Sequence, residues 1–349
     1  MSTSDNAPTL AERIAAAGID ISGPAAPQHP DIAHWRGATR DDIDPMHAVI
    51  AAADRVDHPT WVTPREDVAD GFDLPELDHA RDTILAVAHD GTVVAVGTAL
   101  RHPDETVRIK AYLQGAVHPD WRRRGIGTQV ARWQYARAMQ QLAASASSLP
   151  GEVDFYAHDG NDGAIVIAEA LGLRTARWFA SMVRDNDGPV PDLPARDGVR
   201  IVGYSADRAD DARLARNDAF RDHWGSLPSA PERWQQFVGG PFFRPDLSTL
   251  AVDADGRIVA FCLASVNEDD WATLGASNSY IDLIGVVRDH RGQGLAPRVI
   301  ARTLQAITDA GLSKTVLDVD TDSPTGANTL YEGLGFVATE RERVLVAEF

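Results

Sequence analysis

The sequence predicts an α/β (α+β) protein built from two tandem copies of one folding unit. Three short motifs recur in the same order, each offset by about half of the 349-residue chain. A repeat of this size indicates a duplicated domain. The paired motifs are Leu85–Gly91 with Leu250–Gly256, Arg122–Gly127 with Arg291–Ala296, and Glu169–Leu173 with Glu332–Phe336.

Both copies predict the same order of elements: an acidic helix, a hairpin, a strand, an Arg/Gly loop, a long helix, and a strand–helix–strand ending. Asp90-Gly91 and Asp255-Gly256, each between apolar runs, predict the hairpin turns. The other predicted elements are the first helices 41–56 and 206–224, strands ending at Val117 and Val287, the long helices 127–144 and 295–310, strands 152–157 and 315–319, and a closing strand 343–349.

Composition shifts set the predicted domain boundaries. We expect an N-terminal arm at 1–35 with one helix at 9–17, an N-terminal domain at 36–185, a linker at 186–198, and a C-terminal domain at 199–349. The linker is assigned because it is rich in Pro, Gly and Asp and shows no apolar period.

Charge and composition exclude several classes of protein. With 51 acidic and 33 basic residues the net charge is −18, which disfavours binding to nucleic acid. One cysteine, Cys262, cannot form an intrachain disulfide, and it lies in an apolar run that predicts a buried, inert thiol. No apolar run approaches the roughly 20 residues needed to cross a bilayer, and the N-terminus lacks a signal-peptide pattern. The scattered histidines predict no metal site, so we expect a cytoplasmic protein that binds neither membrane nor metal.

The loop Arg291–Ala296 lies between a predicted strand and a predicted helix. Glycines allow its backbone N–H groups to turn into one concavity, and the helix that follows adds its positive end. Such a loop suits a phosphate or pyrophosphate. It is neither a P-loop, since no Gly-Lys-Ser/Thr follows, nor a dinucleotide fingerprint.

Together with the motif Leu330–Phe336 (LYEGLGF), this loop resembles the GNAT N-acetyltransferase superfamily. The resemblance implies a mixed, mostly antiparallel central sheet flanked by helices in each domain, with acetyl-CoA as co-substrate. It also implies that the loop binds the pyrophosphate, that the preceding strand binds the pantetheine arm, and that Tyr331 protonates the departing thiolate. The cofactor-binding residues implied in copy two are Ile284, Gly285, Val286, Arg291, Gly292, Gln293, Gly294, Leu295 and Ala296.

Copy one matches the superfamily less completely. Arg123 stands where the first loop glycine is usual, and Ala168 stands where copy two has its tyrosine. Tandem members exist in which the C-terminal unit is catalytic, so we expect catalysis in copy two. Whether copy one binds CoA or is a structural remnant stays open. Its implied cofactor-binding residues are Val117, Arg122, Arg123, Arg124, Gly125, Ile126 and Gly127.

The general base is predicted from the strand that precedes the loop. Strand alternation puts Asp282, Ile284 and Val286 on one face, so Asp282 is the first candidate and the acidic run 268–270 the second. Two assignments have structural alternatives: Tyr331 as a core residue, and His223 with Trp224 as core rather than acceptor pocket.

The predicted function is transfer of an acetyl group from acetyl-CoA to the amine of a small molecule, by direct attack in copy two. Two alternatives are an acyl-CoA-binding regulatory protein without turnover, and an acetyltransferase that modifies a protein N-terminus or lysine. We expect a monomer, because tandem halves can bury the surface that a single unit buries in a dimer.

Overall fold

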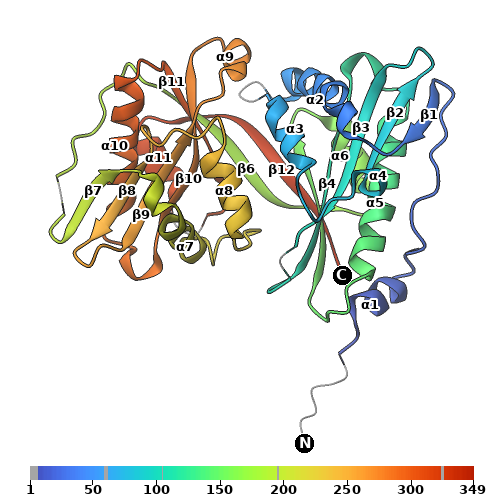
Figure 1. Cartoon of the computed structure of the whole chain (residues 1–349), viewed down its shortest axis with the longest axis horizontal. Coiled ribbons are helices and arrows are strands. Elements are labelled where there is room, and N and C mark those ends of the chain that lie inside the picture. Colours follow the sequence, from blue (N-terminus) through green and yellow to red (C-terminus); the bar gives the residue numbers. More distant parts are fainter. Residues whose placement is uncertain (1–6, 59–61, 104, 195, 324–325) are drawn as a thin grey trace, which may run out of the picture. The chain divides into compact units, whose positions relative to one another are not determined.

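The computed structural model describes residues 7–58, 62–103, 105–194, 196–323 and 326–349. The chain forms two compact units, each drawn in Figure 1: unit 1 is Met1–Trp178 with Glu342–Phe349, and unit 2 is Phe179–Arg341. Each contains a mixed, mostly antiparallel sheet with helices on both faces, which confirms the predicted fold class.

Two long strands make this division differ from the predicted boundaries at 185 and 199. β6 (Arg174–Asp185) begins in unit 1 and ends in unit 2, and β12 (Val337–Glu348) does the reverse. Residues 179–185 of β6 pair antiparallel with β11 (Lys314–Asp320), and residues 342–348 of β12 pair antiparallel with β5 (Gly151–His158). Each copy therefore supplies one strand segment to the sheet of the other.

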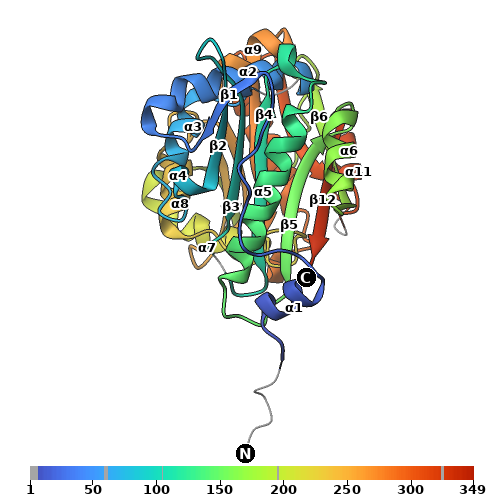
Figure 2. The same ribbon diagram turned by 90° about the vertical axis from the view of Figure 1, so that its right-hand side faces the viewer.

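The sheet of unit 1 has the strand order β1-β2-β3-β4-β5-β12. β4 and β5 are parallel, while β1 to β4 and the pair β5–β12 are antiparallel. Helix α5 lies along one face, as Figure 2 shows. The remaining elements are α1 (Leu10–Ala16), β1 (Ile32–Arg36), η1 (Arg40–Asp42), α2 (Ile43–Asp57), α3 (Arg65–Gly71), α4 (His79–Asp82), β2 (Thr83–Ala88), β3 (Val93–Arg101), β4 (Ile109–Val117), η2 (Pro119–Trp121), α5 (Ile126–Ala143) and α6 (Asp162–Ala170).

Side-chain alternation along the strands divides the core of unit 1 into two layers. Leu85 and Val96 pack with α2 and α3, whereas Ala86 and Ala95 pack beneath α5. The N-terminal arm joins the α5 layer through α1, which begins with a capping box between Thr9 and Glu12. The predicted helix at 9–17 is thus confirmed, while residues 1–6 of the arm lie outside the described residues.

The sheet of unit 2 has the strand order β6-β11-β10-β9-β8-β7. β10 and β11 are parallel, and the other neighbouring pairs are antiparallel. The elements not yet given are β7 (Val199–Gly203), η3 (Ala206–Arg208), α7 (Ala209–Ala219), α8 (Pro231–Gly239), β8 (Thr249–Asp253), β9 (Ile258–Ser265), α9 (Asp269–Leu274), β10 (Asn278–Val286), η4 (Arg288–His290), α10 (Leu295–Asp309) and α11 (Ala327–Gly333).

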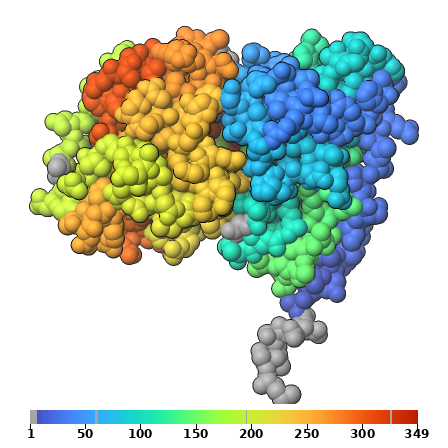
Figure 3. All heavy atoms as spheres, viewed as in Figure 1, coloured from blue at the N-terminus to red at the C-terminus, as the bar shows by residue number. Residues whose placement is uncertain are grey.

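The core of unit 2 also has two layers. One lies beneath α10 and includes Cys262 and Ile281; the other lies beneath α7 and α8 and includes Phe261 and Leu263. Figure 3 shows the segment with α7 and α8 (yellow-green to yellow) on the face of unit 2 turned toward the viewer. Helix α7 ends at Ala219, earlier than predicted, because the residues that follow form turns such as His223 N–H to Phe220 O (3.0 Å).

The turn predictions agree with the backbone. Gly91 (φ +88°) and Gly256 (φ +83°) both adopt the left-handed conformation at the two hairpin turns, where glycine avoids a steric cost. The predicted linker begins with Asn186, whose side chain is buried and donates to Leu312 O (3.0 Å). Residue 195 of the linker lies outside the described residues.

Candidate active site in unit 2

The parallel strands β10 and β11 separate in the middle of the sheet. They pair only at residues 278–280 with 314–316, although β10 continues to Val286 and β11 to Asp320. Beyond Tyr280 each strand is paired on its other side, β10 with β9 and β11 with β6. Among the described strands, the backbone groups of residues 281–286 that point toward β11 therefore have no partner, and the edge of β10 is open there.

The Arg/Gly loop follows β10 directly. Gly292 and Gly294 both have φ +69°, and Gly294 is the N-cap of α10. The first N–H groups of a helix have no partner within the helix. Here they follow Gly292 and Gly294, the two residues with a left-handed backbone conformation. This arrangement forms a nest of N–H groups at the positive end of a helix, next to the opening between β10 and β11.

Arg291 fixes this loop to the end of α7. Its guanidinium donates to Ala219 O (2.8 Å) and Val286 O (3.5 Å) and pairs with Asp222 (3.3 Å). Arg288 also pairs with Asp222. Since these contacts lie within the protein, Arg291 holds the loop in shape, and the backbone N–H groups are left as the donors for an anion.

Tyr331 lies on α11 and packs in the core beneath α10. It is 8% exposed, shares this core with Cys262 and Leu295, and meets the Phe336 ring edge-on at 6.1 Å. Its hydroxyl makes no hydrogen bond to another described residue. Burial raises the pKa of Tyr331, so the phenol keeps its proton at neutral pH.

Asp282 lies at a β-bulge, which changes the predicted geometry. The register of β10 with β9 shifts between Ile281 and Leu283, and Ile281 and Ile284 both pack beneath α10 while Leu283 packs with α7 and α8. Ile284 and Val286 share a face as expected, but the bulge adds a residue to one strand, so regular alternation does not carry that face back to Asp282. Asp282 accepts a hydrogen bond from Ser265 Oγ (3.0 Å).

Cys262 lies one strand away, on β9, and is completely buried. Burial raises the pKa of its thiol to about 12, so it is a neutral core residue at physiological pH. In the second predicted acidic run, Asp270 is buried beside Asn267 at the start of α9. The His223 ring contacts Trp224 O (2.9 Å) and lies near Phe220 (5.3 Å between ring centres).

A polar row that the sequence analysis missed crosses the sheet where β10 and β11 separate. Tyr280 Oη donates to Asp318 Oδ2 (2.6 Å), and Ser181 Oγ donates to Asp318 Oδ1. Burial, followed by the charge of Asp318, raises the pKa of Glu340 on β12 to about 7. The four residues come from four strands, so no local motif marks them.

The Arg/Gly loop of unit 1 has the same backbone shape. Arg123 has φ +62° and Gly125 has φ +91° as N-cap of α5. Arg122 donates to Val117 O (3.1 Å) and pairs with both oxygens of Asp57 (2.8 and 2.7 Å). Ala168, in the place of the tyrosine, is fully buried, so this unit has no phenol at that position.

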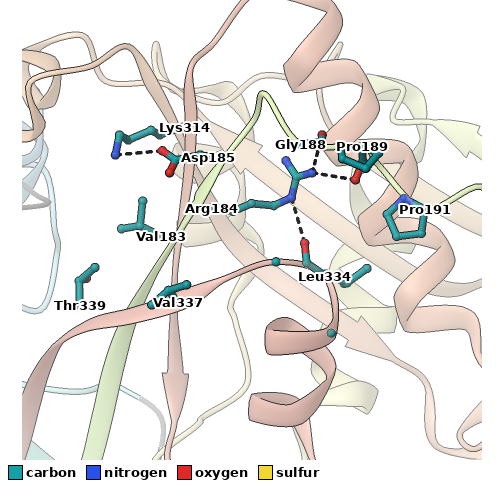
Figure 4. Close-up of a pocket in the computed structure, with 12 residues that line it drawn as sticks. Val183, Arg184, Asp185, Gly188, Pro189, Pro191, Lys314, Leu334, Val337 and Thr339 are labelled. Atoms are coloured by element: carbon teal, nitrogen blue, oxygen red, sulfur yellow. Dashed lines mark hydrogen bonds and ion pairs between the residues drawn. The ribbon is translucent and has the colours of Figure 1, made fainter.

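The pocket drawn in Figure 4 lies elsewhere in unit 2. Its lining comes from the end of β6, the start of the linker, and the segment around α11 and β12. Arg184 there already donates to Leu334 O (2.9 Å), Gly188 O (3.0 Å) and Pro189 O (3.2 Å). None of its lining residues belongs to β10 or to the Arg/Gly loop. The hydrogen bonds of Arg184 hold the chain segments around the pocket together.

The described residues also bear on membrane spanning and metal binding. No helix in these parts of the chain is both long and apolar enough to span a membrane. In the same ranges, no group of three or more His, Cys, Asp or Glu side chains is arranged to hold a metal ion.

Comparisons with known proteins agree with this geometry. The profile of the "Acetyltransferase (GNAT) family" matches residues 48–161 and 210–336. The mycothiol acetyltransferase of Salinispora arenicola is 32% identical over 312 residues, covering 85% of this chain and 96% of that protein. That of Nocardia farcinica is 30% identical over 311 residues, covering 86% and 91%.

Solved structures show the same tandem fold. A GCN5-related N-acetyltransferase from Sphaerobacter thermophilus has a TM-score of 0.68 at 26% identity, covering 92% of this chain and 97% of its own. A tandem GNAT protein from the clavulanic acid biosynthesis pathway has a TM-score of 0.64 at 18% identity, covering 90% and 98%. The chain is an acyltransferase enzyme and belongs to the acetyltransferase (GNAT) family.

Proposed function

We propose that unit 2 transfers an acetyl group from acetyl-CoA to the amine of a small molecule. The observation that carries this proposal is the separation of β10 and β11 directly before the Arg/Gly loop. An opening with free backbone edges leads there to a nest of N–H groups. This is the combination that a long ligand with amide groups at one end and a pyrophosphate at the other requires.

The proposed cofactor contacts follow from this placement. The backbone of Ile284, Gly285 and Val286 lines the open edge of β10 and pairs with the pantetheine amides. The N–H groups of residues 292–296 bind the pyrophosphate, and Arg291 keeps the loop in place from α7. The side chains of the loop contribute less than its backbone, since glycine occupies both left-handed positions.

The chemistry needs one proton acceptor and one proton donor. We assign the acceptor to Asp282, which takes a proton from the attacking ammonium group. The nitrogen then bonds to the thioester carbon and the carbon–sulfur bond breaks. Tyr331 gives its proton to the departing sulfur, and the second proton lost by the nitrogen returns to the Tyr331 phenolate. Burial raises the pKa of Tyr331, so the phenol still carries its proton when the thiolate leaves.

We assign catalysis to unit 2 alone. The loop of unit 1 has the required backbone shape, but Ala168 offers no proton to a leaving thiolate. The chain's resemblance to relatives named mycothiol acetyltransferases supports a small-molecule acceptor over a protein. Two roles stay open for unit 1: it binds acetyl-CoA without turnover, or it is a structural remnant that binds none.

The test combines stoichiometry with turnover. Native mass spectrometry of the full chain counts bound acetyl-CoA, and release of free CoA thiol is followed with aliphatic monoamines, diamines, amino sugars, amino acids and anilines. We expect binding and amine-dependent thiol release. Binding without release would favour the regulatory alternative, release only with peptides would favour a protein acceptor, and no binding would overturn the proposal.

A further inference from the structure

The polar row of unit 2 has an exposed carboxylate in a fixed orientation at its centre. Asp318 is exposed, yet each of its oxygens accepts a hydrogen bond, one from Tyr280 and one from Ser181. A carboxylate oxygen can accept more than one hydrogen bond. The carboxylate therefore keeps its capacity for a further donor, and two neighbouring strands hold it ready for that donor.

The position of this carboxylate relates it to the proposed reaction. Tyr280 is the last residue of β10 that pairs with β11, and its partner is Val316. Asp318 lies two residues farther along β11, on the edge of the opening that the proposed pantetheine arm would occupy. The hydrogen bond from Tyr280 to Asp318 crosses the sheet at the point where the opening begins.

The row also lies on the other face of the sheet from Tyr331. Tyr280 is paired with Ser265 and Val316, whereas its neighbour Ile281 packs with Tyr331 beneath α10. Successive residues of a strand point to opposite faces. This rule applies to Tyr280 and Ile281, because both precede the register shift of the bulge. An acceptor at Asp318 and a proton donor at Tyr331 would thus approach the opening from opposite faces.

The charge around Asp318 favours a cation. Glu340 and Asp318 are both acidic, and burial together with the charge of Asp318 is sufficient to raise the pKa of Glu340 to about 7. A positive group beside Asp318 would relieve this repulsion.

We propose that Asp318, held by Tyr280 and Ser181, binds the ammonium group of the acceptor and so selects amines that are protonated in solution. This proposal rests on the proposed function and adds the acceptor class to it. Asp318 acts by direct contact with the acceptor, and Tyr280 is a positioning residue.

The experiment uses the full chain with 1,4-diaminobutane as the cationic probe and aniline as an amine that is neutral at pH 7.5. Asp318→Asn removes the charge and keeps the shape. Asp255→Asn is the matched control, because Asp255 is an exposed aspartate on the β8–β9 turn. We expect Asp318→Asn to raise KM for 1,4-diaminobutane at least tenfold, with acetyl-CoA affinity and KM for aniline unchanged. Asp255→Asn should change none of these.

Tyr280→Phe tests the positioning role. It should raise KM for 1,4-diaminobutane by a smaller factor, with little change in kcat. The unfolding midpoint should stay unchanged, because a hydrogen bond that only stabilises the fold would lower that midpoint when it is lost. An unchanged KM in Asp318→Asn, or a wild-type preference for aniline, would overturn the inference while the proposed function stands.

A direct binding measurement separates the two proposals. If acetyl-CoA binds but no amine is acetylated, the proposed function fails. Binding of 1,4-diaminobutane to the CoA-loaded protein, followed by saturation-transfer NMR, then still decides the role of Asp318. Binding that is lost in Asp318→Asn and kept in Asp255→Asn supports that role, and equal binding or no binding in the wild type overturns it.

Discussion

Arg123 and Gly292 occupy the same place in the two Arg/Gly loops and share a left-handed backbone, with φ +62° and +69°. Arg123 is the one non-glycine residue with positive φ among the described parts of the chain. In unit 1 the loop thus keeps the conformation that glycine makes easy, at a steric cost that an L side chain imposes. The loop of unit 1 therefore adopts this backbone shape without the glycine that favours it.

Arg123→Gly should therefore stabilise unit 1. Relief of the left-handed strain is worth about 1 kcal/mol, and Arg123 forms no ion pair with another described residue that the substitution would remove. Urea unfolding followed by circular dichroism would measure the gain. Arg123→Ala removes the same side chain but keeps the Cβ, so it should give no such gain; equal stabilisation by both variants would show that the backbone is not strained.

The features that local chemistry determines were predictable from the sequence. Asp-Gly pairs specify tight turns, and Gly91 and Gly256 are left-handed as expected. The Arg/Gly loops and their following helices begin where predicted, with Gly125 and Gly294 as N-caps. Both depend on a few adjacent residues, so one sequence is sufficient to recognise them.

The features that depend on distant partners were not predictable. Residues 343–349 read as a strand, but nothing local indicates that they pair with β5 rather than with their own copy. The bulge at Asp282 depends on how β9 and β10 pack. Tyr280 and Asp318 lie on different strands and each reads as an ordinary polar strand residue, so their hydrogen bond (2.6 Å) is visible only in the fold.

Gly294→Glu should abolish acetyl-CoA binding in unit 2, because it puts a negative charge at the N-terminus of α10. Native mass spectrometry would show the loss of one bound acetyl-CoA per chain. Gly294 has φ +69°, so the substitution also introduces strain. Gly294→Asn is the control, since asparagine tolerates this conformation without a charge. Tight binding retained by the glutamate variant would contradict the assignment of the loop.

Gly285→Ala should destabilise unit 2 by about 1–3 kcal/mol through overpacking. A Cβ at this position would overlap the ring of Phe261 and lie 3.0 Å from Ala219 Cβ. Denaturant unfolding measures the loss. A smaller side chain at position 261 should relieve this overlap. Gly285→Ala should therefore cost less stability in a Phe261→Leu background than in the wild type. Additive costs in this double-mutant cycle would show that the two residues do not compete for space.

Glu340→Gln should stabilise the protein at pH 8 and not at pH 5. Burial and Asp318 raise the pKa of Glu340 from 4.5 to about 7. The folded state therefore binds this proton more tightly than the unfolded state, and the free energy of unfolding falls as pH rises from about 4.5 through 7. Glutamine removes the ionisation and with it this loss. Unfolding midpoints across pH 5–8 are the measurement, and parallel pH profiles of wild type and variant would contradict the shift.

Tyr331→Phe should lower kcat by about 10²–10⁴, the range for a positioned proton donor, and leave acetyl-CoA affinity unchanged, because the phenol acts on the leaving sulfur and not on the bound thioester. Tyr204→Phe is a close control, because Tyr204 and Tyr331 are both 8% exposed in unit 2 and the substitution removes the same hydroxyl from a buried ring. Steady-state thiol release should fall only in Tyr331→Phe. Equal rates in the two variants would mean that Tyr331 serves the core and that another group, or water, protonates the sulfur.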